Sequence, residues 1–419
     1  MFEGIKSVSE LSRSTARSII ESLADGVVPR VGAHLFTAGR EKWLHSLDED
    51  LEDLSDDACY DGRLRIINGR NGDGKTHLMH LLRQRAWSAG FAVSYVVISD
   101  QVPLHRWDLV YGEIGKSIAT RCHPESPGLR SILNPRSPDP DIAQDFVSKV
   151  VDIRSMSGLH PNFAEAIYRY CTEQTVNVDS QQDMLLLGSW LEGYASRLSG
   201  MGVTGKIDRA NGAAMLRSVA LALRRFGFRG LVILVDEVES VLSQTKPRRR
   251  ESYQTLRLLV DRENMPAHTL IAASTTPPMY TDLERGMSTY PALWSRLKPE
   301  LDTDFVNYNA TLIDLTRTPL SKSDYLEIAQ CIRAIHGQAR GQDHLNRVQQ
   351  SFLTAAANVA ASGHLTLTYS PTRVFVKLIT ETLELAHQHP DYCPSTNDMD
   401  EQFGNIDQRI KNRSQVSKE

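Results

Sequence analysis

The chain has 419 residues, of which 41% are hydrophobic, so it is long enough for two or three domains with a sizeable core. Its net charge of -4 comes from 47 basic and 51 acidic side chains, which excludes an overall basic field; any DNA contact must be a local patch. The five cysteines are too far apart for a zinc site and are typical of reduced thiols. The sequence has no signal-like start and no apolar run of about 18 residues, so we expect a cytoplasmic protein without membrane segments.

Two helices are predicted near the start of the chain. Residues 14–24 and 41–54 each repeat apolar side chains at helical spacing, and the first stretch ends at the turn containing Gly26 and Pro29. We interpret the acidic residues of the second stretch as its solvated side.

Five short runs are nearly continuously apolar, a pattern typical of strands that helices cover on both faces. Helical stretches separate them, so the sequence predicts an α/β fold with a mainly parallel sheet. The runs are 64–68, 92–99, 231–236, 269–275 and 310–316.

A long segment, about 100–230, separates the second predicted strand from the third. Within it, the proline-rich stretch 134–141 predicts a loop, whereas 162–173 and 213–226 have the periodicity of helices. We interpret the segment as a helical insertion.

After Thr316 the sequence predicts a small bundle of helices over 321–336, 346–360 and 371–386. The final residues, 389–419, are polar, and we expect a tail that is mobile or docked on a partner.

A complete GxxxxGK[ST] phosphate-binding loop lies between a predicted strand and a predicted helix, a context that argues against a chance glycine-rich turn. Backbone amides and the helix N-terminus would bind the phosphates. Lys75 would bridge the β- and γ-phosphates of ATP, and Thr76 would place its hydroxyl on Mg²⁺. The residues assigned to nucleotide binding are Gly69, Arg70, Asn71, Gly72, Asp73, Gly74, Lys75, Thr76 and His77.

Asp73 is unusual because it puts a carboxylate inside this loop. An inward-facing carboxylate would repel the phosphates. Because the loop amides face the phosphates, we expect the Asp73 side chain to face outward, and a change to Ala to tighten ATP binding little.

A second signal is the apolar run 231–235, which ends in Asp236 and Glu237. Taken alone, such a run is as often a strand ending in a polar turn. Paired with the phosphate loop, it predicts that Asp236 holds Mg²⁺ through water and that Glu237 is the general base for the attacking water. The two carboxylates favour ATP hydrolysis over passive binding.

Three further positions complete the catalytic hypothesis. Ser274, or its neighbours Thr275 and Thr276, would orient the water or contact the γ-phosphate, although capping of the strand end is an equal alternative. Arg296 would reach a neighbouring subunit's γ-phosphate in a ring, the alternative being a surface arginine. Arg373, near the start of a bundle helix, would reach back to the phosphates.

The chain resembles an AAA+-type ATPase with a helical lid. The Gly39-Arg40-Glu41 turn resembles the entry motif of the origin-recognition and STAND branches, and Arg373 resembles their second sensor. More narrowly, residues 14–385 resemble the BrxD-like ATP-binding protein family of BREX-type bacterial defence islands. The stretches that carry this resemblance are "ARSIIESLADGVVPR", "GREKWL", "GDGKTHLMHLL", "RGLVILVDEVES", "YPALWSRL" and "YSPTRVFVKLI".

The resemblance implies a role in sensing or acting on invading DNA. It also implies partners from the same defence system, such as helicase, methyltransferase or TerB-like components, and a homo-oligomer. Asp73 departs from the small neutral residue of many such loops, and the long insertion has no residue-by-residue match. The expected domains are a helical segment 1–38, a P-loop ATPase core 39–316, a helical lid 317–388 and a polar tail 389–419.

A basic run formed by Lys246, Arg248, Arg249 and Arg250 is a candidate patch for DNA phosphates, a partner or a neighbouring subunit. Without interleaved aromatic residues it is equally a solvated loop. Two hypotheses follow for the whole protein: a Mg²⁺-dependent ATPase that assembles or remodels a defence complex on DNA, or a slow nucleotide-gated switch that acts through a partner effector.

Overall fold

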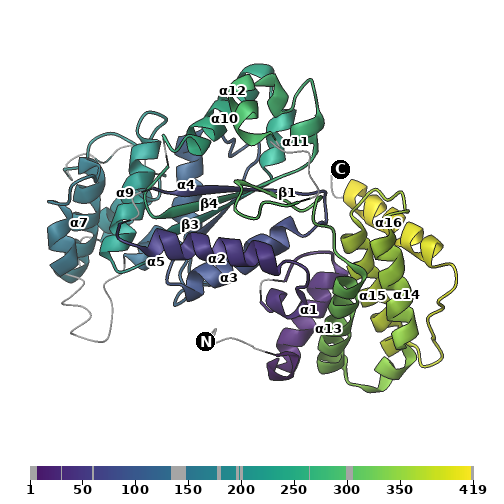
Figure 1. Cartoon of the computed structure of the whole chain (residues 1–419). Coiled ribbons are helices and arrows are strands. Elements are labelled where there is room, and N and C mark those ends of the chain that lie inside the picture. The colour runs from purple at the N-terminus through teal and green to yellow at the C-terminus, as the bar shows by residue number, and fades with distance from the viewer. Residues whose placement is uncertain are drawn as a thin grey trace.

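The computed structural model of the chain is drawn in Figure 1. Among the helices that it describes, none combines the length and apolar composition that crossing a bilayer requires. The described residues are 7–29, 31–58, 61–133, 148–176, 181–194, 198, 202–263, 265–298 and 305–416.

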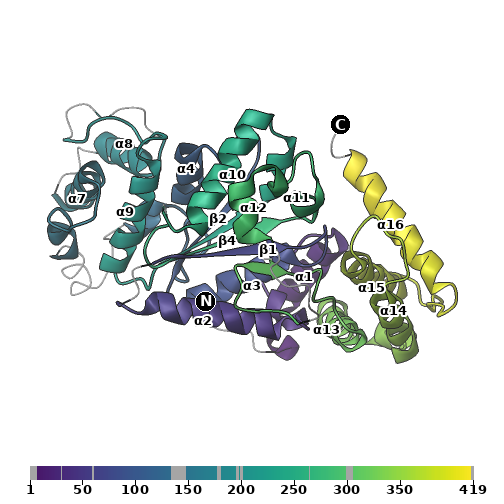
Figure 2. The same cartoon turned by 45° about the horizontal axis from the view of Figure 1, so that its top comes forward.

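Five parallel strands form one sheet in the order β2-β3-β4-β1-β5 (Figures 1 and 2). The five predicted strands and the α/β P-loop NTPase class are therefore confirmed. Asn68 is in register with both Thr275 and Asp314, so the carboxyl ends of β1, β4 and β5 meet at one edge. The strands are β1 Arg63–Asn68, β2 Ala92–Val97, β3 Leu231–Asp236, β4 Thr269–Thr275 and β5 Leu312–Asp314.

Helices cover both faces of the sheet, which explains why the strands are continuously apolar (Figure 1). Consecutive residues of β1 enter different cores: Ile67 packs with α2 and α3, and Ile66 packs with α4 and α10. The helices of the first face are α2 Glu41–Ser55 and α3 Lys75–Ser88. Those of the second face are α4 Trp107–Ser117, α10 Lys246–Val260, α11 Pro278–Thr281 and α12 Pro291–Leu297, with the 3-10 turns η4 Val238–Ser243 and η5 Met287–Thr289.

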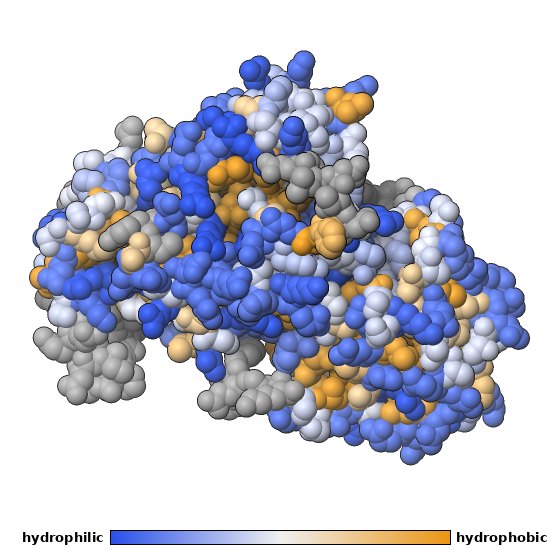
Figure 3. Space-filling view, in the orientation of Figure 1, coloured by the Kyte–Doolittle hydropathy of each residue, from blue (hydrophilic) through white to orange (hydrophobic). Residues whose placement is uncertain are grey.

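The outer side of α2 is acidic and solvated, as predicted, and the surface over this helix is mainly hydrophilic in Figure 3. Asp50 is the exception. It is buried and forms ion pairs with Arg63 and Arg65 of β1, because an isolated buried carboxylate would be costly.

The segment between β2 and β3 is helical, as predicted. Its helices pack against α4 through contacts such as the hydrogen bond from the Tyr111 hydroxyl to the Leu191 carbonyl, 2.6 Å long. The proline-rich stretch 134–141 lies outside the described residues. The described helices between α4 and β3 are α5 Leu129–Ile132, α7 Pro161–Val176, α8 Gln181–Leu191 and α9 Gly212–Arg225.

A helical bundle follows β5. Its first helix begins with a capping box, in which the Ser321 hydroxyl accepts the Asp324 amide and the Asp324 carboxylate accepts the Ser321 amide. The bundle consists of α13 Lys322–Arg340, α14 Gln350–Ser362, α15 Pro371–Gln388 and α16 Met399–Val416, with the 3-10 turn η6 Asp343–Arg347.

Helix α16 differs from the expected polar tail, mobile or docked on a partner, because it packs on the chain's own bundle. Although the segment is polar overall, Met399, Phe403, Ile406 and Ile410 recur at helical spacing and are buried in the same core as the bundle. These few apolar residues are sufficient because α14 and α15 supply the surface on which they pack.

The first helix, α1 Arg13–Ala24, packs on this bundle rather than on the sheet (Figure 1). Guanidinium groups of Arg13 and Arg17 both donate to the Ala339 carbonyl at 3.2 Å. At the other end of α1, the buried ammonium of Lys377 on α15 donates to the Ala24 carbonyl. The remaining 3-10 turns near the start are η1 Val8–Glu10 and η2 Ala33–Phe36.

Candidate nucleotide site

The loop between β1 and α3 has the backbone that a phosphate cradle requires. Gly72 and Gly74 have φ angles of +100° and +97°, in the left-handed region that favours glycine. A Cβ atom at Gly72 would also lie 2.5 Å from the Cβ atom of Arg373 on α15, so this helix approaches the loop too closely for a side chain there. The first amides of α3 have no partner within the helix and can bind an anion.

The Lys75 side chain is buried beneath this loop. Its ammonium group donates to the Gly69 carbonyl at 2.8 Å and to the Arg70 carbonyl at 3.4 Å. The loop carbonyls therefore hold the Lys75 ammonium group beside the loop amides, which are the groups that would bind a phosphate.

The Asp73 carboxylate turns back onto the loop that contains it. It accepts the backbone amide of Arg70 at 2.6 Å, and the buried guanidinium of Arg40 donates to the Asp73 carbonyl at 3.5 Å. Asp73 thus stabilises the loop through a contact within the loop itself, whereas an outward-facing side chain was expected.

Asp236, at the end of β3, is the centre of a hydrogen-bond network. One of its oxygens accepts the Thr76 hydroxyl at 3.2 Å and also the Tyr95 hydroxyl, and the other accepts the Ser274 hydroxyl. Burial, followed by the negative charge of Asp236, raises the pKa of Tyr95, which therefore remains a proton donor. The predicted pair Asp236 and Thr76 is brought together, although the two residues are far apart in the sequence.

Glu237 follows Asp236 with a φ of +59°, an unusual value for a residue other than glycine. Its amide donates to the Asp236 carboxylate and to the Ser274 hydroxyl, both at 3.0 Å, which holds the backbone in this conformation. The side chain is exposed and lines the pocket above the loop. Strained conformations of this kind are common at functional sites.

The structure adds a third carboxyl group, Glu239, which sequence reasoning missed. It lies on η4 and lines the same pocket as Lys75 and Glu237, and its Oε2 atom is buried without a hydrogen-bond partner in the described part of the chain. Burial raises the pKa of Glu239 to about 7. The three acidic residues of "DEVE" are visible in the sequence, but only the turn at Glu237 brings Glu239 back to the pocket.

The polar end of β4 differs from expectation. Ser274 and Thr275 are fully buried, and Ser274 supports Asp236 from behind instead of lining the pocket. The side chain that faces the pocket from this strand end is Thr276. Thr276 lies one residue beyond the end of β4, and a run of three hydroxyl residues does not reveal which of them lines the pocket.

A pocket of about 760 Å³ lies between the sheet edge and the helical bundle. This size suits a small-molecule site. The loop and the three carboxylates line one side. The opposite side is mainly apolar and comes from the α1–η2 segment and the bundle: Leu23, Val27, Val28, Pro29, Phe36, Ala38, Leu320, Ile328 and Val376.

Arg373 and His77 also line this pocket. The Arg373 guanidinium lies over the Tyr369 ring at 5.0 Å, and its Nε atom is buried without a partner in the described residues. His77 Nε2 is hydrogen-bonded to Thr37 Oγ1 at 2.7 Å, and burial lowers the pKa of His77 to about 4, so the imidazole is neutral at physiological pH.

Arg296 lies on α12, away from the lining of the nucleotide pocket. Its guanidinium forms an ion pair with Asp261 at the end of α10 and donates to the Ala292 carbonyl at 2.6 Å. A role for Arg296 at the phosphates therefore requires another subunit.

The basic run forms the start of α10, where Lys246, Arg248 and Arg250 are exposed. Arg249 differs from them, because its guanidinium donates to the Gln244 carbonyl at 2.8 Å and stabilises the helix start. Arg209 of the insertion lies close to this helix start, because its charge and that of Arg248 both act on His105. Burial lowers the pKa of His105, and these two charges lower it further.

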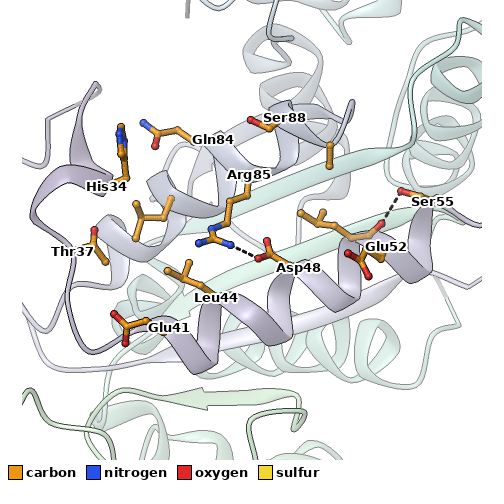
Figure 4. Close-up of a pocket in the computed structure, with 13 residues that line it drawn as sticks. His34, Thr37, Glu41, Leu44, Asp48, Glu52, Ser55, Gln84, Arg85 and Ser88 are labelled. Carbon is orange, nitrogen blue, oxygen red and sulfur yellow. Dashed lines mark hydrogen bonds and ion pairs between the residues drawn. The ribbon is translucent and has the colours of Figure 1, made fainter. Parts of the chain in front are cut away.

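A second cavity, of about 650 Å³, lies between α2 and α3 (Figure 4). The ion pair between Arg85 and Asp48 joins its two walls. None of the phosphate-loop residues lines it.

Comparison with known families agrees with this geometry. The family model described as BREX system ATP-binding protein BrxC/D matches residues 11–135 and 137–401, which is nearly the whole chain. The chain belongs to this family. No curated protein matches the chain. The predicted family is thereby confirmed, and ATP binding is the activity that its description names.

Proposed function

We propose that this BREX family member is a Mg²⁺-dependent ATPase whose turnover assembles or remodels a defence complex. The observation that carries the proposal is the position of Glu237. Its exposed carboxylate lines the same pocket as Lys75 and directly follows Asp236, to which Thr76 is hydrogen-bonded. Nucleotide binding alone has no use for such a base.

The residues present fit Mg²⁺ and ATP. The carboxylate of Asp236 and the hydroxyl of Thr76 are hard oxygen donors 3.2 Å apart, and the buried Nε of Arg373 lacks a partner that a phosphate oxygen would provide. When bound, Mg²⁺ would be held by these two side chains and would neutralise phosphate charge.

In the reaction that we propose, Lys75 leaves the loop carbonyls and binds the β- and γ-phosphates. Glu237 accepts a proton from water while the water oxygen bonds to the γ-phosphorus and the bond to the β-phosphate oxygen breaks. ADP and phosphate are released, and Glu237 returns the proton to solvent. Arg373 balances the charge that develops on the transferred group.

Replacing Glu237 tests the proposal. We expect Glu237→Gln to bind ATP as tightly as the parent and to lose phosphate release by at least about 10²-fold, because the amide cannot accept the proton. Nucleotide titration and steady-state phosphate release measure the two effects. The exposed Glu327→Gln on α13 is the matched control. Equal phosphate release from Glu237→Gln and parent contradicts the proposed role.

A slow nucleotide-gated switch is the second candidate, and one contact favours it. The amide of Ser370, the residue that caps α15, donates to the Asn71 carbonyl of the phosphate loop at 3.0 Å, so the lid contacts the loop directly. A switch would act through a partner effector and would complete one slow turnover per protein. Multiple turnovers, with stimulation by DNA, favour the ATPase.

Direct DNA binding is a further proposal, supported by the exposed side chains of Lys246, Arg248 and Arg250 beside Arg209. We expect the triple change of these three α10 residues to Ala to weaken DNA binding and to reduce its salt dependence, since each phosphate contact contributes about 0.9 to the logarithmic slope. A filter or anisotropy assay at several salt concentrations measures this. Lys322→Ala combined with Lys411→Ala is the control. Unchanged DNA binding in the triple variant would contradict a role of this basic run in DNA binding.

A further inference from the structure

The least explained group in the nucleotide pocket is the carboxyl of Glu239. Its Oε2 atom is shielded from solvent and has no hydrogen-bond partner among the described residues. Buried carboxylate oxygens in proteins are normally paired, and an exception needs an explanation. Because the Glu239 side chain lines the pocket, a molecule bound there lies beside the carboxyl, and rotation of the side chain would let that molecule supply the missing partner.

The neighbours of Glu239 already have other partners. The Lys75 ammonium donates to the Gly69 and Arg70 carbonyls, and its charge acts on Glu239 only as an electrostatic effect that opposes burial of the carboxyl. Asp236 is held by Thr76, Tyr95 and Ser274 at the end of β3. Apart from a hydrogen bond with its own backbone amide, the Glu239 carboxyl has no hydrogen-bond partner among the described residues, unlike Asp236 at the same site.

The local backbone explains how Glu239 reaches the pocket. Glu237 adopts a left-handed conformation, and the chain then forms the 3-10 turn η4, in which Val238 and Val241 point into the core. Between these two anchors, Glu239 lines the pocket together with Glu237 and with Thr276 from the end of β4. The strained residue thus places two glutamates, rather than one, at the same opening.

We propose that Glu239 is a catalytic residue that holds the attacking water by a hydrogen bond while Glu237 accepts its proton. This inference rests on the proposed ATPase function. In the step itself, the water proton moves to Glu237, the water oxygen bonds to the γ-phosphorus, and ADP departs. Glu239 gains or loses no proton; it restricts the water to the line of attack, which lowers the entropic cost of the reaction.

The test compares Glu239→Ala with Glu239→Gln. Removing the group should lower kcat by about 10²-fold and leave the Kd for ATP within about threefold, because the water and not the nucleotide loses its contact. Glutamine keeps a hydrogen-bonding oxygen and should restore most of the activity, whereas Glu237→Gln remains inactive. Glu327→Ala is the control and should behave as the parent.

One binding measurement and one stability measurement separate this role from others. ATP binding is titrated at several Mg²⁺ concentrations, and thermal unfolding is followed without nucleotide. An unchanged Mg²⁺ requirement and an unchanged melting temperature in Glu239→Ala support the water-holding role. An increased Mg²⁺ requirement would identify a metal ligand instead, and a lowered melting temperature a structural group; either overturns the inference.

The outcomes also distinguish the inference from the function on which it rests. A parent protein that releases no phosphate overturns the ATPase, and the role of Glu239 with it. A parent that turns over ATP, with Glu239→Ala equally active, overturns the inference alone.

Discussion

At the scale of single residues, Asp73 illustrates how a carboxylate is accommodated in the candidate phosphate-binding loop. Its carboxylate accepts the Arg70 amide and lies near the buried Arg40 guanidinium. Burial lowers the pKa of Arg40, and the negative charge of Asp73 opposes this effect. A bound phosphate would therefore meet an Asp73 charge that the Arg70 amide and the Arg40 guanidinium already compensate.

We expect Asp73→Ala to weaken ATP binding, by at most about tenfold, because the loop loses a charge-assisted hydrogen bond that solvent partly replaces. Asp73→Asn, which keeps an oxygen acceptor, should bind within about threefold of the parent. Titration with a fluorescent ATP analogue measures both. Tighter binding by Asp73→Ala would mean that the carboxylate repels the nucleotide.

The sequence predicted residues whose roles depend on local spacing. Lys75 and Thr76 follow from the loop motif, and Asp236 follows from the end of an apolar strand. It could not predict Tyr95 or Glu239, because their contacts depend on which strand lies beside β3 and on the positive φ of Glu237. It could not separate Ser274 from Thr276 either, since the hydrogen bond from Ser274 to Asp236 depends on β4 lying beside β3.

At the scale of elements, the bundle contains a histidine cluster at the junction of α13, η6 and α15. His336 is fully buried, its Nδ1 lies 2.7 Å from His344 Nε2, and His387 and Glu384 of α15 are adjacent. Burial lowers the pKa of His336 to about 4; Glu384 opposes this effect, whereas His344, His387 and Arg340 add to it.

This cluster predicts acid sensitivity of the bundle. The folded pKa of His336 is below its ordinary value of 6.5, so the unfolded chain binds the proton first. The contribution of neutral His336 to the free energy of unfolding is therefore fully present above pH 6.5. It decreases as the pH falls toward 4, by about 1 to 2 kcal/mol at pH 5. Between pH 7 and pH 5, the free energy of unfolding measured with denaturant should change less for His336→Gln than for the parent or the exposed His389→Gln. An equal change in all three proteins would exclude the cluster as the source of the acid sensitivity.

Element prediction succeeded where periodicity was long and failed for α16. The strands and α13 to α15 have continuous patterns that local reasoning detects. In α16 the apolar residues are few, and the helix is stable only because the groove between α14 and α15 receives them. Such stabilisation by packing cannot be read from the segment alone.

At the scale of the whole molecule, Arg296 makes the oligomer testable. In one chain it pairs with Asp261 and lies outside the pocket, so a catalytic role requires a neighbouring subunit. We expect Arg296→Ala and Glu237→Gln each to be inactive alone, and a mixture of them to release phosphate, because an intact site then meets an intact arginine. A mixture no more active than its components would leave Arg296 as a structural residue.

The packing of α1 on the bundle has a mechanical consequence. Because α1 lies with the last four helices, the polypeptide passes between the two halves of the molecule twice, once through residues 25–40 and once through 315–321. Arg40 of the first passage donates to the Thr318 carbonyl of the second at 2.7 Å. A hydrogen bond therefore joins the two connections to each other. Because Arg40 also donates to the Asp73 carbonyl, this junction adjoins the candidate phosphate-binding loop.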